Sequence, residues 1–177
     1  FWHASAQIAA LSGWLAQHIA EPRIRADDAY TFGLFRDCGI VILLRRFPDY
    51  MKILDQANRD GVNVFTDSEQ AALPTDHAVV GCLLAQNWWL PEEICLAIRH
   101  HHDPLAISGP AASLPPSSRH LIAIAQTAEY FVQQITGGSR TEEWGKLGGA
   151  CLNLLRLDET SLATYFPGAE ALLRAID

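Results

Sequence analysis

Basic residues are scarce in this sequence, and they do not cluster. The 177 residues include 13 Lys and Arg against 20 Asp and Glu, which gives a formal net charge of −7. No run of basic side chains could follow a phosphate backbone, so we expect no nucleic-acid partner. Long apolar runs are missing too. None approaches the ~18 residues of a membrane span, and no signal-peptide pattern is present, so we expect no membrane partner.

Paired cysteines are also absent. The four cysteines lie far apart, outside any CxxC motif, at Cys38, Cys82, Cys95 and Cys151. Each has apolar neighbours, which favours buried, reduced thiols and a cytoplasmic location. The chain lacks an initiator Met and begins at Phe1 inside a helical pattern. We therefore expect that an N-terminal part of the full protein is absent.

Strand pairs, hairpin turns and internal repeats are not found either. Apolar residues recur at helical spacing instead, most clearly in the stripe from Leu121 to Ile135, which Gly137 ends. Asp76 is expected to cap a helix that begins at His77. We predict an all-α fold with about eight or nine helices in one domain over residues 1–177, with residues 138–177 as its C-terminal helices.

One stretch, Ala29 to Leu44, is apolar nearly all round, which predicts a central helix wrapped by others. It contains one charged pair, Arg36 and Asp37. Because an unpaired charge is costly in such a setting, we expect this pair to have a partner or a chemical role.

Other patterns predict boundaries elsewhere. Thr66–Glu69 has the form of a capping box that begins a short helix. Residues 104–118 are rich in Pro, Ser, Ala and Gly, which predicts a surface loop. Asp158 is expected to cap a short helix ending at Phe166, with Pro167 beginning the last helix.

Side chains that can bind a metal gather in two places. One is Asp37, and the other is His77 together with the run His100–His102. Imidazoles and a carboxylate offered from several helices could form a metal site. Each also has a simpler role, because a histidine at a helix start can cap it or face solvent, and histidines at a helix end favour the helix dipole.

Together with their surroundings, these residues resemble the HDOD domain, a signalling branch of the HD-domain superfamily of metal phosphohydrolases. The resemblance covers roughly residues 1 to 137. It is carried, in order, by Phe1-Trp-His-Ala-Ser-Ala-Gln-Ile-Ala9, Gly33-Leu-Phe-Arg-Asp-Cys-Gly39, Phe47-Pro48, Asp76-His77-Ala-Val-Val-Gly81, Trp89-Leu-Pro91 and Ile98-Arg-His-His-His102. It implies a helical bundle of the HD-domain type.

The resemblance also implies a degenerate metal site. Catalytic members of the superfamily hold one or two ions with a first histidine, a His-Asp pair, further histidines and a late aspartate. The first histidine falls on Ala4, beside His3, the defining histidine falls on Arg36, and the late aspartate falls at Gln126. Asp37, His77, His101 and His102 remain as residual metal candidates.

These replacements argue against catalysis. Arg36 has no lone pair to donate and brings a cation to the place of the ion, while Ala4 and Gln126 do not replace the missing ligands. Without a metal no activated water attacks a phosphate, so we expect no catalytic residue. Arg36 can pair with Asp37 or a neighbouring acid and fill the cavity. A sharper hypothesis is that Arg36, His101 and His102 bind an anion such as a nucleotide or phosphate.

Three functions remain in view. The first is a catalytically inactive signal-transduction domain that acts through other signalling proteins or domains. The second is a divergent metal-dependent phosphohydrolase of the nucleotide or cyclic-dinucleotide phosphodiesterase type. The third is a helical scaffold in which Trp88 and Trp89 belong to the core or, alternatively, dock a partner. We expect no resident cofactor, although the residual cluster could take up Zn²⁺ or Ni²⁺ adventitiously. A homodimer is left open.

Overall fold

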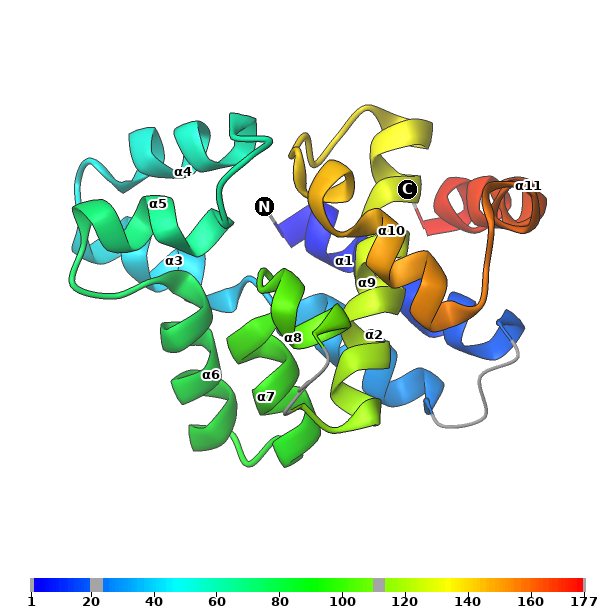
Figure 1. The fold of residues 1–177 in the computed structure, drawn as a ribbon, viewed down its shortest axis with the longest axis horizontal. Coiled ribbons are helices and arrows are strands. Elements are labelled where there is room, and N and C mark those ends of the chain that lie inside the picture. Colours follow the sequence, from blue (N-terminus) through cyan, green and yellow to red (C-terminus); the bar gives the residue numbers. More distant parts are fainter. Residues whose placement is uncertain (1, 20–23, 110–113, 177) are drawn as a thin grey trace.

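The computed structural model describes residues 2–19, 24–109 and 114–176, and within these ranges the chain forms eleven helices and no strand (Figure 1). The predicted all-α class is confirmed. The helices are α1 (Trp2–His18), α2 (Ala26–Phe35), α3 (Cys38–Arg46), α4 (Tyr50–Arg59), α5 (Phe65–Ala72), α6 (His77–Asn87), α7 (Glu92–His100), α8 (Pro104–Ser108), α9 (Pro116–Thr136), α10 (Glu143–Leu155) and α11 (Glu159–Ile176). Phe1, part of the first motif, lies outside the described residues.

The helix at the centre of the fold is α9. Its buried residues run almost without a gap from Ser118 to Val132, and α1, α2, α7 and α10 all pack against it (Figure 1). The apolar stripe predicted for this helix is confirmed. It ends at Gly137, whose φ of 69° is left-handed and suits glycine.

The stretch from Ala29 to Leu44 is not one central helix, as expected, but parts of two. The helix α2 ends at Phe35 and α3 begins at Cys38, with Asp37 between them at φ −102° and ψ 12°. After this break the backbones of α3 and α6 meet at Gly39, where an added Cβ would lie 2.0 Å from the carbonyl oxygen of His77. Glycine is therefore required here, and the contact sets Asp37 beside the start of α6.

Two apolar clusters hold the helices together. The larger one joins residues of α1, α2 and α6 to α11, and the smaller one consists of Ile40, Leu43 and Tyr50. A cavity lies between them, lined by Ile8 of the larger cluster and Ile40 of the smaller. The site described below opens onto this cavity.

Three local predictions differ from the structure in part. The short helix predicted at Thr66–Glu69 is present as α5, which begins at Phe65, but its capping box is not formed, and Glu69 is buried in the interior. The described part of residues 104–118 is not wholly a loop, since it contains α8 and the start of α9, while residues 110–113 of the predicted loop lie outside the described residues. The last helix, α11, runs through Pro167 because Ala169 and Leu173 beyond it are buried.

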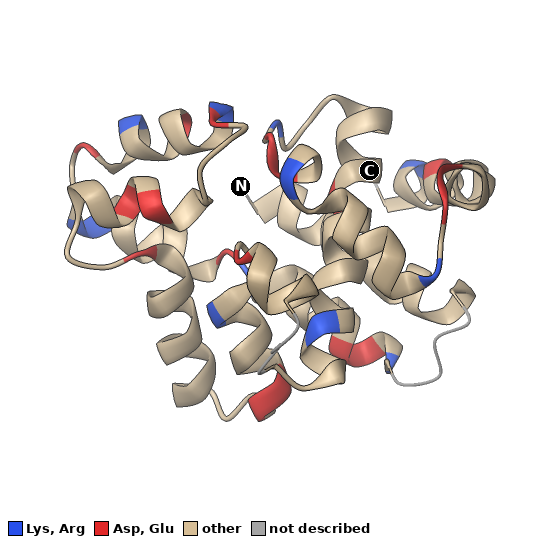
Figure 2. Ribbon diagram, viewed as in Figure 1, with Lys and Arg blue, Asp and Glu red and all other residues tan. Residues whose placement is uncertain are grey.

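Three features of the described residues match what the sequence was noted to lack. No helix among the described residues is long and apolar enough to cross a membrane. The four cysteines are free and buried. Lys and Arg residues of the described ranges are scattered over several helices rather than gathered along one of them (Figure 2).

Candidate functional site

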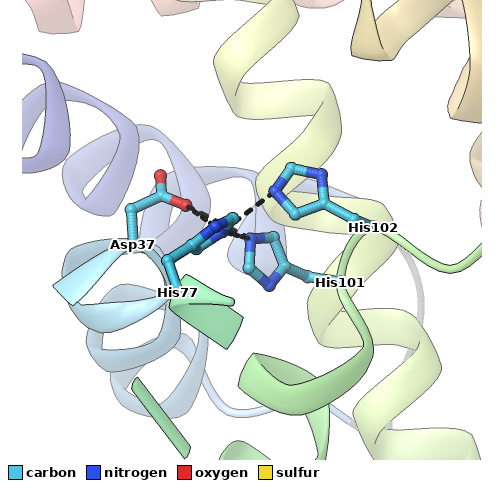
Figure 3. A group of neighbouring side chains, drawn as sticks. All are labelled: Asp37, His77, His101 and His102. Carbon is cyan, nitrogen blue, oxygen red and sulfur yellow. Dashed lines mark hydrogen bonds and ion pairs between the residues drawn. The ribbon is translucent and has the colours of Figure 1, made fainter. Parts of the chain in front are cut away.

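Three histidines and one aspartate that are distant in sequence converge on one point. Asp37 comes from the α2–α3 junction, His77 from the start of α6, and His101 and His102 from the end of α7 (Figure 3). The Nε2 atom of His77 lies 3.1 Å from His102 Nε2 and 3.4 Å from His101 Nε2. Asp37 Oδ1 lies 3.2 Å from His101 Nε2 and 3.8 Å from His77 Nε2. The structure thus brings together all four residual metal candidates.

The other nitrogen of each imidazole has its own partner. His77 Nδ1 lies 2.7 Å from Glu69 Oε2, His102 Nδ1 lies 2.5 Å from Glu143 Oε2, and His101 Nδ1 lies 2.8 Å from the carbonyl oxygen of Ile98. Because these partners are acceptors, each Nδ1 donates its hydrogen and each Nε2 directs a lone pair toward the others. The surroundings therefore select the tautomer that binds a cation.

His77 is held most firmly of the three. Asp76 caps α6 by accepting a hydrogen bond of 2.7 Å from the backbone of Val79, as predicted. Glu69, fully buried, also accepts hydrogen bonds from the His77 backbone amide and the Tyr50 hydroxyl. Burial alone would lower the pKa of His77, but the hydrogen bond and the charge of Glu69 outweigh it and raise that pKa. Burial and the neighbouring imidazoles keep the pKa of His102 well below its usual value.

Arg36 lies on the opposite side of Asp37 and makes the expected internal ion pair. Its Nε is 3.1 Å from Asp37 Oδ2. Its second partner is Glu129 on α9, with Oε1 2.7 Å away and both side chains 5% exposed. Burial would raise the pKa of Asp37, yet the charge of Arg36 outweighs it and holds that pKa well below its usual value. Asp37 is thus ionised and lies between a guanidinium and the imidazoles.

The cavity beside this network has a volume of about 250 Å³. Its lining includes Arg36, Asp37 and His102, together with Ala4, whose side chain offers no donor atom. Gln126, at the position expected for a late carboxylate, instead donates a hydrogen bond of 3.2 Å to Glu129. The carboxylate that α9 contributes near the site is therefore that of Glu129, and it forms an ion pair with Arg36.

A comparison with protein families places the chain. The model of the HDOD domain matches residues 1–104. The chain belongs to the HDOD family. A curated relative, an uncharacterized protein of Treponema pallidum (strain Nichols), is 33% identical to this HDOD domain over 78 residues, which are 43% of the chain and 15% of the relative.

Solved structures share the fold. An HDOD domain protein with unknown function from Geobacter sulfurreducens has a TM-score of 0.67 at 21% identity and covers 98% of this chain. A "Putative phosphohydrolase" from Shewanella amazonensis SB2B has a TM-score of 0.64 at 20% identity over 100% of the chain. A "Putative signal transduction protein" from Marinobacter aquaeolei VT8 has a TM-score of 0.65 at 21% identity over 99%. The chain spans 60%, 63% and 38% of these three proteins, respectively.

The donor atoms of this HDOD domain fit one transition-metal ion. A tetrahedral ion with Zn–N bonds of about 2.0–2.1 Å keeps its ligand atoms about 3.3 Å apart. Three of the separations in the cluster, 3.1, 3.2 and 3.4 Å, are close to this value, and all four donor atoms lie within 4.8 Å of one another. Three imidazoles and a carboxylate suit Zn²⁺, Ni²⁺ or Co²⁺ better than Mg²⁺.

The charges around the site also suit one divalent cation. Four carboxylates in direct contact with the site residues or with their partners face two cations, Arg36 and Lys146, and leave a net charge of −2 when the imidazoles are neutral. The carboxylates are Asp37, Glu69, Glu129 and Glu143. A second ion does not fit beside Asp37, because the guanidinium already contacts its other oxygen.

Sequence reasoning missed the acids that orient the site. Glu69 was assigned to a capping box, and Glu129 and Glu143 were not singled out. The only available signal was a charged residue at a buried helical position, such as Glu129 between Ala128 and Phe131.

Other candidates lie outside the site. His3 is exposed on α1, and His100 is directed to Asp103, 3.9 Å away, rather than to the cluster. Of the two alternatives left open for the tryptophan pair, the core does not apply: Trp88 is half exposed with its ring in a T-shaped contact with Phe35, and Trp89 is 92% exposed.

Proposed function

We propose that this HDOD domain is a regulatory module that does not hydrolyse phosphoesters and acts through contacts with other signalling proteins. One observation carries the proposal: the buried guanidinium of Arg36 contacts Asp37 Oδ2 at 3.1 Å and Glu129 Oε1 at 2.7 Å. Arginine keeps its proton and has no lone pair to donate. Asp37 therefore cannot bridge two metal ions, which removes a two-ion mechanism of phosphoester cleavage.

The anion pocket built on Arg36, His101 and His102 has less support. The donors of Arg36 already serve two carboxylates. Glu129 and Glu143 line the same cavity and would repel a phosphate. His102, whose pKa is lowered by burial and by the neighbouring imidazoles, adds no positive charge near neutral pH.

We further propose that the cluster binds a single transition-metal ion, which goes beyond the adventitious uptake expected from the sequence. Asp37, His77, His101 and His102 would hold it, supported by the tautomers that Glu69 and Glu143 select. Bound there, it would supply a cross-link between the α2–α3 junction, α6 and the end of α7. This role is structural and requires no turnover.

The rival function is a divergent phosphohydrolase with one ion beside the cavity. To separate the two, the chain is purified without a histidine tag, analysed for metal content and assayed with bis(p-nitrophenyl) phosphate and a cyclic dinucleotide in Mn²⁺ and in Zn²⁺. We expect up to one ion per chain and no turnover. Turnover that follows metal content and disappears in His77→Ala would overturn the proposal.

The protein-contact part needs a separate measurement. Light scattering over a concentration series, repeated with Trp88→Ala and Trp89→Ala, tests self-association through the exposed tryptophans. A mass that rises with concentration in the wild type and not in the variants identifies a homodimer face. A constant monomer mass directs the search to a different protein partner.

A further inference from the structure

The first turn of α10 directly contacts the cluster of Asp37, His77, His101 and His102 that forms the proposed ion site. Glu143 Oε2 lies 2.5 Å from His102 Nδ1, and the two side chains are 2% and 9% exposed. Lys146, one turn later on α10, forms an ion pair with the other oxygen of Glu143. The orientation of His102 thus depends on a helix that lies beyond residues 1–104, the part matched by the family model.

The same turn of α10 also holds the segment between α4 and α5. Lys146 Nζ donates a hydrogen bond of 2.9 Å to the carbonyl oxygen of Asn63, and the backbone amide of Glu142 donates one of 3.0 Å to the carbonyl oxygen of Asn58. The Lys146 side chain is only 9% exposed. These two hydrogen bonds therefore join the start of α10 to residues 58–63. The two parts of the chain lie close together in Figure 1.

Residues just after this segment also contact the cluster. The ring of Phe65 is stacked on His102 with centroids 4.4 Å apart and presents its edge to His77 at 5.4 Å. Glu69, one turn further along α5, holds His77 Nδ1. The imidazoles thus contact residues of both α5 and α10, so a change in their position affects both helices.

We infer that ion occupancy of the cluster controls how firmly α10 closes on the α4–α5 segment, through Glu143 and Lys146. This inference rests on the single-ion site proposed above. Ion binding requires His102 to present Nε2, which favours the Glu143 contact, and Glu143 in turn favours the Lys146 contact with Asn63. Because such coupling is reciprocal, weakening the Lys146 contact must also weaken ion binding. Glu143 and Lys146 are positioning residues, and neither is a ligand.

The test uses the whole chain and Zn²⁺ or Co²⁺ as the probe. Affinity is measured by competition with a chromophoric chelator for the wild type, Glu143→Gln and Lys146→Met. We expect the Glu143 variant to bind about 10- to 100-fold more weakly and the Lys146 variant to bind more weakly by a smaller factor. The visible absorption of bound Co²⁺ should change in Glu143→Gln and stay as in the wild type in Lys146→Met, because the four ligands are retained. Lys52→Met is the matched control, since Lys52 is an exposed cation of α4 that pairs only with Asp49 in the described structure.

Hydrogen exchange gives the second readout. In the wild type, adding Zn²⁺ should slow exchange in residues 58–65 and 141–147 as well as at the ligands, and in Lys146→Met the slowing at 58–65 should be lost. If the wild type binds no ion, the proposed ion site fails. If it binds the ion but both variants bind equally tightly, or exchange changes only at the ligands, the coupling fails and the site stands.

Discussion

Arg36 and Glu129 form an ion pair of 2.7 Å between the α2–α3 junction and α9, with both side chains 5% exposed. The pair fills part of the cavity and supplies a fixed positive charge next to Asp37. Ser139 adds a hydrogen bond of 2.8 Å from its hydroxyl to Glu129, so the acid is held from a second side. Breaking such a pair is expected to cost more than its formation contributes, because a lone buried charge remains.

Replacing Arg36 tests this asymmetry. We expect Arg36→Met to reduce the free energy of unfolding by about 3–5 kcal/mol, because it leaves Asp37 and Glu129 without their cation. Arg36→Lys keeps the charge and should lose less. Urea unfolding of the single variants, Glu129→Gln and the double variant forms a mutant cycle. Strictly additive losses would contradict a direct pair.

Ion binding at the cluster should raise stability. An ion at 100 times its Kd adds about 2.7 kcal/mol to the free energy of unfolding. We therefore expect Zn²⁺ to raise the Tm of the wild type and EDTA to reverse the effect. His77→Ala should show no such rise, while His3→Ala, which alters an exposed histidine outside the cluster, should behave as the wild type does. An equal rise in both variants would place the ion elsewhere.

The end of α6 carries a strained backbone. Trp89 has φ of 60°, a left-handed conformation that costs a side-chain-bearing residue about 1–2 kcal/mol. The Leu90 amide donates to the carbonyl oxygen of Ala85 at 3.0 Å, the arrangement in which glycine commonly follows a helix. We expect Trp89→Gly to raise the free energy of unfolding by about 0.5–1 kcal/mol, net of the greater freedom of glycine in the unfolded chain.

The neighbouring tryptophan provides the control for that change. Trp88 has φ of −92°, so glycine brings no relief there, and its contact with Phe35 would be lost. Trp88→Gly should therefore destabilise the protein. If the backbone of Trp89 is strained, chemical denaturation should show changes of opposite sign in the free energy of unfolding of the two variants. Changes of the same sign would mean that the loss of an exposed side chain alone determines the effect.

The contact between α3 and α6 allows no side chain at Gly39. We expect Gly39→Ala to cost about 3 kcal/mol or more, because the Cβ would meet the backbone of His77 and push the helices apart. Gly149, on the exposed face of α10, has no atom within 4 Å of an added Cβ. Gly149→Ala should stabilise the protein by about 0.5–1 kcal/mol. Thermal melts of Gly39→Ala and Gly149→Ala therefore compare the same substitution at a filled and at an open position.

Asp60 should make the free energy of unfolding depend on pH in the acidic range. Hydrogen bonds from Asn63 and the Val62 amide lower the pKa of this exposed carboxyl from 3.8 to about 2. Since the pKa is lower in the folded state, the stabilisation is complete above pH ~4 and is lost as pH falls toward about 2. The wild type should exceed Asp60→Asn in stability at pH 6, and the gap should close between pH 4 and pH 2. A gap that stays constant over this range would contradict the shift.

Much of the fold could be predicted from the sequence, because the buried apolar residues of a helix recur at a regular spacing. The stripe of α9 and the cap at Asp76 depend on neighbours a few residues away, and both are confirmed. The break between Phe35 and Cys38 was not predicted, since no proline marks it and the contact of Gly39 with His77 forms only when the chain folds. Glu69, a capping residue by local pattern, serves His77 instead.

The site was predicted only in part for the same reason. Its four candidate ligands were named from their chemistry and resemblance, and they do lie together. The acids behind them were missed, because Glu129 and Glu143 meet Arg36 and His102 only after the chain has folded back. Nothing in the local sequence around either glutamate indicates that meeting.

The direct contact of backbones at Gly39 also governs how freely the rest of these helices can vary. Most helix pairs are separated by side chains, so each exchange of a large residue for a small one shifts the axes. Here the main chains already touch. We therefore expect substitutions elsewhere on α3 and α6 to change the spacing between Asp37 and His77 only slightly.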